Sequence, residues 1–145
     1  MILPDVNVLV YAYRPDAPNH VQSRKWLDHV ADSVSAFGIS KLTLSAFVRI
    51  VTNPRIHDIP TPLDAAFAFC DALLGQPNCT IVEPGPRHWA IFRNVCLATN
   101  TRGKNTTDAW FAALAIESGC EWVTFDRDFA RFPGLKCTIL SASNH

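Results

Sequence analysis

Aspartate residues recur in this sequence where a predicted strand ends or a predicted helix begins. Each alone is typical of a helix cap, because a carboxylate near a helix N-terminus accepts hydrogen bonds from free backbone N–H groups. Together they indicate more, since carboxylates brought within several Å of one another repel unless a cation or a proton shares the site. Their convergence would require a hard divalent cation. These aspartates are Asp5, Asp108, Asp126 and Asp128.

Carboxylate ligands limit the choice of metal. All-oxygen sites with retained waters suit Mg²⁺ or Mn²⁺ better than Zn²⁺, and none of the five histidines belongs to an H-x-x-x-H pair. A divalent ion held in this way bridges phosphate oxygens, lowers the pKa of a bound water and stabilises the leaving oxygen of an in-line displacement. This chemistry predicts hydrolysis of a phosphodiester bond by a metal-activated water, without a covalent intermediate.

Other catalytic motifs fail on inspection. Gly103-Lys104 resembles the end of a P-loop, but Ala98 replaces the first glycine and Asn105 replaces the Ser or Thr. The sequence contains no G-x-G-x-x-G and no G-x-S-x-G. Dinucleotide binding and serine hydrolysis therefore have no local support.

The elements that must position the aspartates alternate along the chain. Short apolar runs predict strands over residues 1–5, 36–39, 80–83, 121–125 and 136–140. Helical spacing and breaker residues predict helices over 6–13, from 18 or 19 to about 34, over 44–53, 63–74, 89–96 and 108–118, a helical turn over 127–131, and a loop over 99–107. Such alternation favours a parallel α/β sheet covered on both faces, whose carboxyl edge binds ligands. Asp5, Asp108, Asp126 and Asp128 are all predicted at that edge.

Composition favours one compact soluble domain over residues 1–145, because 48% of the residues are hydrophobic and 18% are charged. The formal net charge is +0, so a nucleic acid would have to be attracted by a local basic patch. The five cysteines form no C-x-x-C pair and are expected to be buried free thiols of a cytoplasmic protein. No apolar run reaches the roughly 18–20 residues that a membrane span needs.

Three stretches resemble the motifs of PIN-domain ribonucleases, in particular the VapC toxins of toxin–antitoxin systems. They are LPDVNVLVYA at 3–12, NTTDAWFAALA at 105–115 and TFDRDF at 124–129. The resemblance spans essentially the whole chain and implies a PIN-like three-layer α/β/α sandwich with a small central parallel sheet. It further implies an Mg²⁺- or Mn²⁺-dependent endoribonuclease that cleaves RNA, forms a homodimer and is inhibited by a cognate antitoxin.

The resemblance assigns roles to individual residues. Asp5 and Asp108 match the two principal metal-binding acids, and Asp126 matches the later acid of the Thr-x-Asp motif, which gives it a catalytic role beside them. Asp128 is a further candidate metal ligand. Asn7 matches a small polar residue that orients a carboxylate or a water, with a simple helix N-cap as the alternative.

One position departs from the family pattern. Ala46 stands where the family places its second acid, which predicts one firmly held metal ion and a second that depends on bound RNA. Substrate phosphates need nearby cations, and the residues predicted to supply them are Arg49, Arg102 and Lys104.

Aromatic and histidine side chains near the site have structural interpretations. Trp89 and Trp110 could stack on an unpaired base, but both fit apolar helical stripes and are predicted to lie in the core. His88 is predicted to lie on the surface at the start of a helix. Two other functions remain open: a catalytically weak PIN-fold module that binds RNA or protein, which Ala46 favours, and a metal-dependent phosphatase or DNA nuclease.

Overall fold

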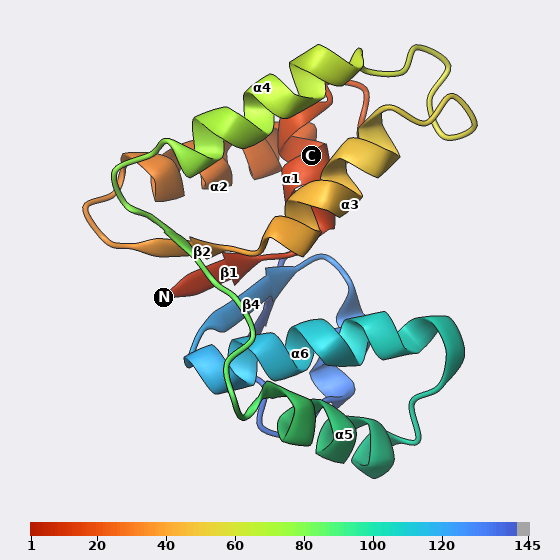
Figure 1. The fold of residues 1–145 in the computed structure, drawn as a ribbon. Helices are drawn as coiled ribbons and strands as arrows, with labels where there is room; N and C mark the ends of the chain where they lie inside the picture. Colours follow the sequence, from red (N-terminus) through yellow and green to blue (C-terminus); the bar gives the residue numbers. More distant parts are fainter. Residues whose placement is uncertain (142–145) are drawn as a thin grey trace.

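The computed structural model describes residues 1–141, and its centre is a sheet of five parallel strands. Every strand pair is parallel, and the order across the sheet is β3-β2-β1-β4-β5 (Figure 1). All five predicted strands are confirmed; four are shorter than predicted by a residue or more, and β3 begins one residue earlier and ends two residues earlier than predicted. They are β1 (Ile2–Pro4), β2 (Phe37–Ile39), β3 (Cys79–Ile81), β4 (Glu121–Thr124) and β5 (Cys137–Ile139).

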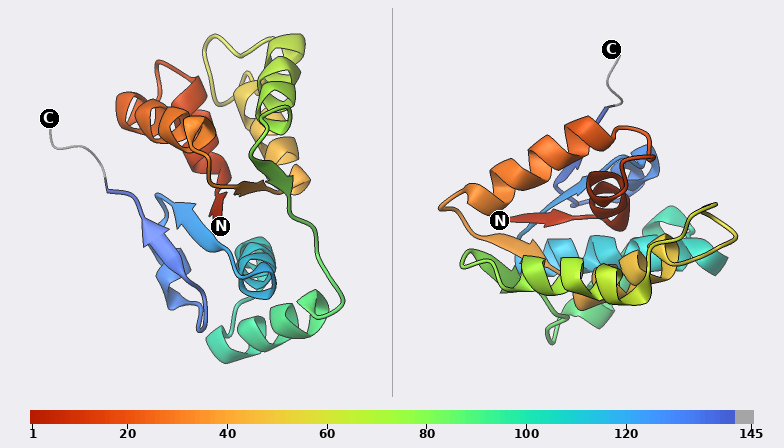
Figure 2. Two further views of the ribbon diagram at one scale, coloured as in Figure 1. Left: turned by 90° about the vertical axis from the view of Figure 1, so that its left-hand side faces the viewer. Right: turned by 90° about the horizontal axis from the view of Figure 1, so that it is seen from above.

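Helices cover both sides of this sheet, so the predicted three-layer α/β fold is confirmed. Figure 2 shows α1 to α4 on one side of the strands and α5 and α6 on the other. No helix within residues 1–141 combines the length and the apolarity that crossing a membrane requires. The helices are α1 (Val6–Tyr13), α2 (His20–Asp32), α3 (Lys41–Val51), α4 (Leu63–Leu74), α5 (His88–Thr99) and α6 (Thr106–Ser118), with short 3₁₀ helices η1 (Gly103–Asn105) and η2 (Arg127–Arg131).

Two apolar clusters hold these layers together. Ile2 of β1 packs against the cluster under α1 to α4, whereas the next residue, Leu3, belongs to the cluster under α5 and α6. Successive side chains of a strand point to opposite faces, so one short strand serves both cores. Phe47 of α3 is fully buried in the first cluster, and Trp122 of β4 is fully buried in the second.

Close packing around β1 requires small residues. The α6 helix presents four alanines with no exposed surface, which lets it lie close to the sheet. In β2, a Cβ atom at Gly38 would lie 2.7 Å from Cγ2 of Val82 and 3.3 Å from Cδ1 of Leu3. A side chain at that position would therefore force Val82 to move.

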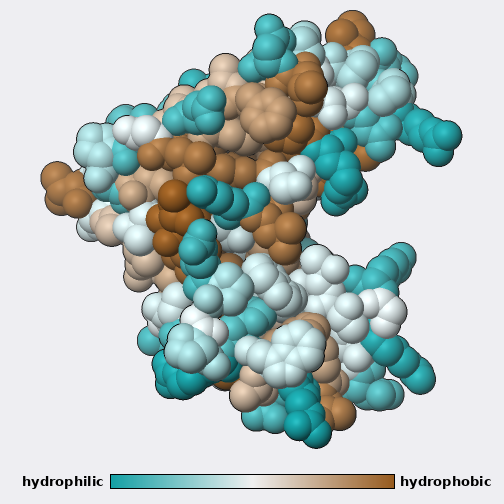
Figure 3. Space-filling view, in the orientation of Figure 1, coloured by the Kyte–Doolittle hydropathy of each residue, from teal (hydrophilic) through white to brown (hydrophobic). Residues whose placement is uncertain are grey.

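The chain order of the strands reverses between β1 and β4. From β1 the chain builds β2 and β3 on one side, then returns through α5 and α6 to build β4 and β5 on the other. The backbone N–H of Asp5 donates to the carbonyl of Val123 at 2.8 Å and so joins the two strands beyond β1. In open α/β sheets, a crevice at such a reversal is where ligands bind. Figure 3 shows the molecule hollowed between its α3/α4 half and its α5/α6 half.

Two sequence-based predictions near α5 are wrong for one reason. Trp89 is 71% exposed rather than buried, and His88 is 4% exposed rather than at the surface. The Nε2–H group of His88 donates to the carbonyl of Trp110 at 3.0 Å, while Trp110 packs partly buried against the second cluster, as predicted. An offset of one residue rotates a helix face by about 100°, so the apolar stripe starts at His88 rather than at Trp89.

The loop predicted over residues 99–107 is also partly wrong. It contains η1, and α6 begins at Thr106 rather than at Asp108. Asp108 lies in the first turn of α6 after the N-cap Asn105, as its interpretation as a helix-capping acid predicts. The cysteines are free, as predicted, but only Cys70 and Cys120 are buried; Cys79, Cys96 and Cys137 are partly exposed.

Candidate active site

Asp5 is the most enclosed of the predicted site residues. It is 9% exposed and follows β1 directly as the N-cap of α1, where its Oδ1 accepts a hydrogen bond from the backbone N–H of Val6 at 2.7 Å. The hydroxyl of Thr124, which is fully buried, donates to Oδ2 at 2.7 Å. Both carboxylate oxygens are therefore fixed by groups from two neighbouring strand ends.

Asn7 links the same two strand ends. Its Nδ2 donates to Oγ1 of Thr124 at 3.1 Å and to Oδ2 of Asp5 at 3.4 Å, and its Oδ1 accepts from the backbone N–H of Phe125 at 3.3 Å. The N-cap of α1 is Asp5, so the alternative in which Asn7 caps the helix is wrong. Its amide instead restrains the carboxylate of Asp5 against the end of β4.

Burial raises the pKa of Asp5 to about 6. The hydrogen bonds from Thr124 and Val6 oppose this rise, while the negative charges of Asp108 and Asp126 add to it. Burial also raises the pKa of Asp108, with a further rise from Asp126, an opposing effect of Arg131 and a smaller rise from Asp128. The fold thus brings all of the predicted acids into one electrostatic neighbourhood, although they come from three separate stretches of the chain.

Asp126 and Asp128 lie at the outer side of this neighbourhood. Asp126 is the N-cap of η2, and its Oδ1 accepts from the backbone N–H of Asp128 at 2.9 Å. Asp126 is partly exposed and Asp128 is exposed. The capping interpretation of Asp126 is therefore confirmed, alongside its proximity to the other acids.

The donor set suits a magnesium-like ion. Within residues 1–141, no three His, Cys, Asp or Glu side chains come close enough to hold one metal ion directly. Mg²⁺ is usually bound by one or two carboxylates and keeps several waters, so two acids such as Asp5 and Asp108 would be enough to hold it. Zn²⁺ would need three or four protein ligands in a structural or catalytic site, and the neighbourhood does not offer them.

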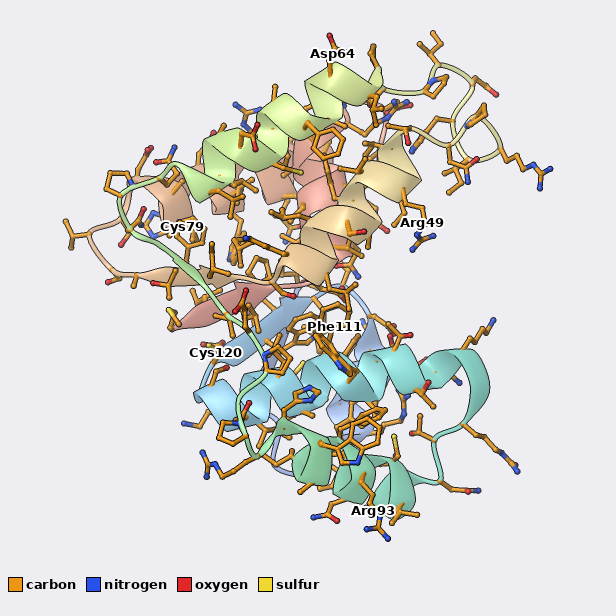
Figure 4. All side chains as sticks on the ribbon, viewed as in Figure 1. Arg49, Asp64, Cys79, Arg93, Phe111 and Cys120 are labelled. Atoms are coloured by element: carbon orange, nitrogen blue, oxygen red, sulfur yellow. The ribbon has the colours of Figure 1, made fainter. Side chains whose placement is uncertain are left out.

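The predicted cations lie on both halves of the molecule. Arg49 is exposed on α3, and its side chain projects toward the gap between the two halves in Figure 4. Arg102 and Lys104 are exposed on the connection that leads from α5 to α6 and so to Asp108. Ala46 is partly buried on α3, the same helix as Arg49, and its methyl group supplies no carboxylate to the site.

Sequence reasoning missed two residues of the neighbourhood. The TFDRDF motif contains Thr124 but assigns it no role, whereas in the structure its hydroxyl contacts Asp5, Asn7 and the backbone N–H of Asp126. Arg131 belongs to none of the three motifs, yet its charge acts on Asp108. The signal for Thr124 was its place two residues before Asp126, since a hydroxyl there faces the same sheet edge.

Comparison with known proteins identifies the class of this fold and site. Residues 2–135 match the PIN domain family. The chain therefore belongs to the PIN domain family, and the resemblance seen in its motifs is confirmed.

The relatives narrow this to the VapC branch. The chain is 41% identical to ribonuclease VapC25 of Mycobacterium tuberculosis over 136 residues, which cover 94% of this chain and 96% of the relative. It is 36% identical to ribonuclease VapC33 of the same species over 138 residues, covering 95% of this chain and 96% of the relative.

Solved structures share the fold at lower identity. The VapBC2 structure from Rickettsia felis, bound to a promoter DNA fragment, aligns with a TM-score of 0.70 and 18% identity, covering 96% of this chain and 98% of that one. VapC20 of Mycobacterium tuberculosis, a toxin that cleaves the sarcin-ricin loop, aligns with a TM-score of 0.68 and 15% identity, covering 94% and 99%.

Proposed function

We propose that this protein is an endoribonuclease toxin that hydrolyses RNA phosphodiester bonds with the help of Mg²⁺ or Mn²⁺. The observation that carries the proposal is the buried Asp5 carboxylate, whose pKa is raised to about 6 beside the further charges of Asp108 and Asp126. A buried carboxylate among like charges is stabilised by a cation. Relatives named VapC ribonucleases support RNA as the substrate.

Some residues of the chain would bind the cation directly, and others hold those ligands in place. Asp5 and Asp108 would be its protein ligands, with Asp126 acting directly or through a water and Asp128 at the margin. Thr124 and Asn7 keep the Asp5 carboxylate in one orientation through their hydrogen bonds. A bound ion would supply a positive charge that polarises the phosphate and lowers the pKa of a nearby water. Because Ala46 replaces an acid, we expect one firmly held ion.

A cognate antitoxin is the expected partner. The similar solved structures include VapBC assemblies from Rickettsia felis and Salmonella typhimurium, which supports a protein that binds this chain and blocks its site. An Arg or Lys of that partner would neutralise the acidic neighbourhood as the ion does, and so compete with it. We also propose that the protein forms a homodimer and is located in the cytoplasm.

The test is RNA cleavage by a pair of carboxylate variants. Asp108→Asn removes one ligand with little change in shape, and we expect it to abolish Mg²⁺- and Mn²⁺-dependent cleavage while the protein stays folded by circular dichroism. Asp128→Asn makes the same change at the exposed margin and should cleave nearly as well as the wild type. Equal cleavage by Asp108→Asn and the wild type would contradict the proposal.

One observation favours a second candidate, a PIN-fold module that binds RNA without cutting it. Ala46 stands where the family pattern has an acid, so the site has one carboxylate fewer with which to hold a metal ion. Wild-type protein that binds RNA but leaves structured and unstructured RNA intact in Mn²⁺ would support this module over the nuclease.

A further inference from the structure

A polar hollow of about 360 Å³ lies beside the acidic site. It lies between the end of α5, the connection containing η1 and the 3₁₀ helix η2, and its lining includes Arg102 and Arg131 as well as Asp128. Asp128 raises the pKa of Asp108 and Arg131 lowers it, so the hollow and the site lie within electrostatic range of each other. A ligand that spans both would place one group on the acids and another in the hollow.

Two arginines give the hollow its positive character. Arg131 is held in place by its Nη1, which donates to the carbonyl of Asp128 at 2.7 Å, and by its guanidinium, which lies 4.1 Å from the centroid of the Phe132 ring. Neither Arg131 nor Arg102 forms an ion pair with any residue in 1–141. Their remaining N–H groups are free for a ligand, and the forked geometry of guanidinium matches the oxygens of a phosphate.

Two asparagines add neutral polar groups. Asn100 ends α5 in the left-handed conformation, with φ 50°, and Asn105 immediately precedes α6. In the part of the chain that the structure describes, neither side-chain amide has a hydrogen-bond partner, whereas the hydroxyls of Thr99 and Thr101 bond to each other at 2.6 Å. A free amide offers a donor and an acceptor, which suits the edge of an unpaired base.

We infer that this hollow is a substrate-positioning subsite for single-stranded RNA. Arg102 and Arg131 bind the backbone phosphate next to the one that is cleaved, and Asn100 and Asn105 contact the base of that nucleotide. The inference rests on the proposed function for the choice of RNA as the ligand. An unpaired strand is required because only splayed bases expose their edges to side chains in this way.

The experiment measures binding of a short fluorescent single-stranded RNA by anisotropy over a range of salt concentrations. All proteins carry Asp108→Asn, so that the RNA stays intact. Adding Arg131→Gln or Arg102→Gln should weaken binding about tenfold, the effect of losing one charge-assisted hydrogen bond. Each should also reduce the slope of log affinity against log salt by about 0.7, the value for one phosphate contact on a single strand.

Matched variants control for charge and folding. Arg93→Gln makes the same charge change on the exposed far side of α5 (Figure 4) and should leave affinity and slope unchanged. Arg131→Lys keeps the charge, so the slope should stay while the affinity falls. Asn105→Ala, on a separate element, should weaken binding without changing the slope. Arg131→Gln and Arg102→Gln proteins that bind RNA like the Arg93→Gln protein would overturn the subsite.

The outcomes separate the subsite from the proposed function. A wild type that cuts no RNA in Mg²⁺ or Mn²⁺, combined with weakened binding by the Arg131→Gln and Arg102→Gln proteins, overturns the nuclease and supports the subsite. A wild type that cuts RNA, combined with arginine variants that bind RNA as tightly as the Asp108→Asn protein alone, overturns the subsite and leaves the nuclease standing.

Discussion

Asp5 and Asp126 both lie within two residues of a strand end, and their strands, β1 and β4, are neighbours in the sheet. Their carboxylates nevertheless differ. Asp5 is 9% exposed with its pKa raised to about 6, while Asp126 is partly exposed and caps the short surface helix η2. The difference arises because α1, which Asp5 caps, is buried among other elements. Burial, more than the number of nearby acids, therefore raises the pKa values of Asp5 and Asp108, and these two carboxylates gain most from a bound cation.

The largest expected effect is on RNA cleavage when Asp5 is replaced by asparagine, compared with the same change at Asp126. Asp5→Asn should reduce RNA cleavage by about 100-fold or more, because changes outside the ligand shell already cost about 10–100-fold in metal sites. Asp126→Asn should cost about tenfold, since it acts at the margin. Initial cleavage rates at saturating Mn²⁺ measure both. Equal losses in the two variants would remove the distinction between the strand ends.

The free energy of unfolding should show the same distinction in metal-free protein. The folded pKa of Asp5, about 6, lies above its ordinary value of 3.8, so the native state holds this proton more tightly than the unfolded state. The stability from this group is fully present below that ordinary value and is lost as pH rises through the folded pKa. At about 1.4 kcal/mol per pKa unit, the loss is about 3 kcal/mol.

Urea denaturation in EDTA, between about pH 4 and pH 8, tests this loss. Asp5→Asn should flatten the fall in stability over that interval, whereas Asp126→Asn should follow the wild type. Added Mg²⁺ should restore stability to the wild type at the upper end of the range. An Asp5→Asn curve parallel to the wild type would show that Asp5 does not carry the effect.

A smaller loss is expected from the hydroxyl that joins the two strand ends. Thr124→Val keeps the shape of the side chain but removes the donor to Asp5 and the acceptor for Asn7. Cleavage should fall about tenfold, as for other residues that orient a metal ligand, and the pKa of Asp5 should rise further. Thr138→Val on β5, whose hydroxyl donates to Glu121 away from these contacts, is the control. Identical rates for the two variants would rule out a positioning role.

The smallest expected effect on RNA cleavage comes from Arg49, an exposed cation on α3 in the other half of the molecule from Asp108. Arg49→Gln should raise KM for RNA about threefold with kcat unchanged, because a solvated arginine contributes only a modest, salt-screened attraction. Steady-state cleavage at two salt concentrations separates KM from kcat. Arg24→Gln, which loses an ion pair with Asp28 on α2, should change neither parameter. A fall in kcat for Arg49→Gln would place this residue closer to the reacting phosphate than its exposure suggests.

The sequence predicted those parts of the fold that depend on local patterns. Every strand and the acids at the strand ends follow from apolar runs and their flanking residues. The prediction of the buried face of α5 was wrong because the helical stripes that start at His88 and at Trp89 are nearly equal in apolar content. Only packing against α6 decides which of the two stripes is buried. The role of Thr124 depends on a contact with Asp5 across 119 positions, and that of Arg131 depends on how η2 folds back toward α6. Such long-range contacts leave no periodic signal.

The most direct test is the pKa of the Asp5 carboxyl group, measured by carbon-detected NMR titration with and without Mg²⁺. The buried, cation-demanding site predicts a pKa of about 6 in metal-free protein and a marked fall when Mg²⁺ is added, with little response in Asp108→Asn. A pKa near the ordinary value of 3.8 that Mg²⁺ leaves unchanged would contradict the account.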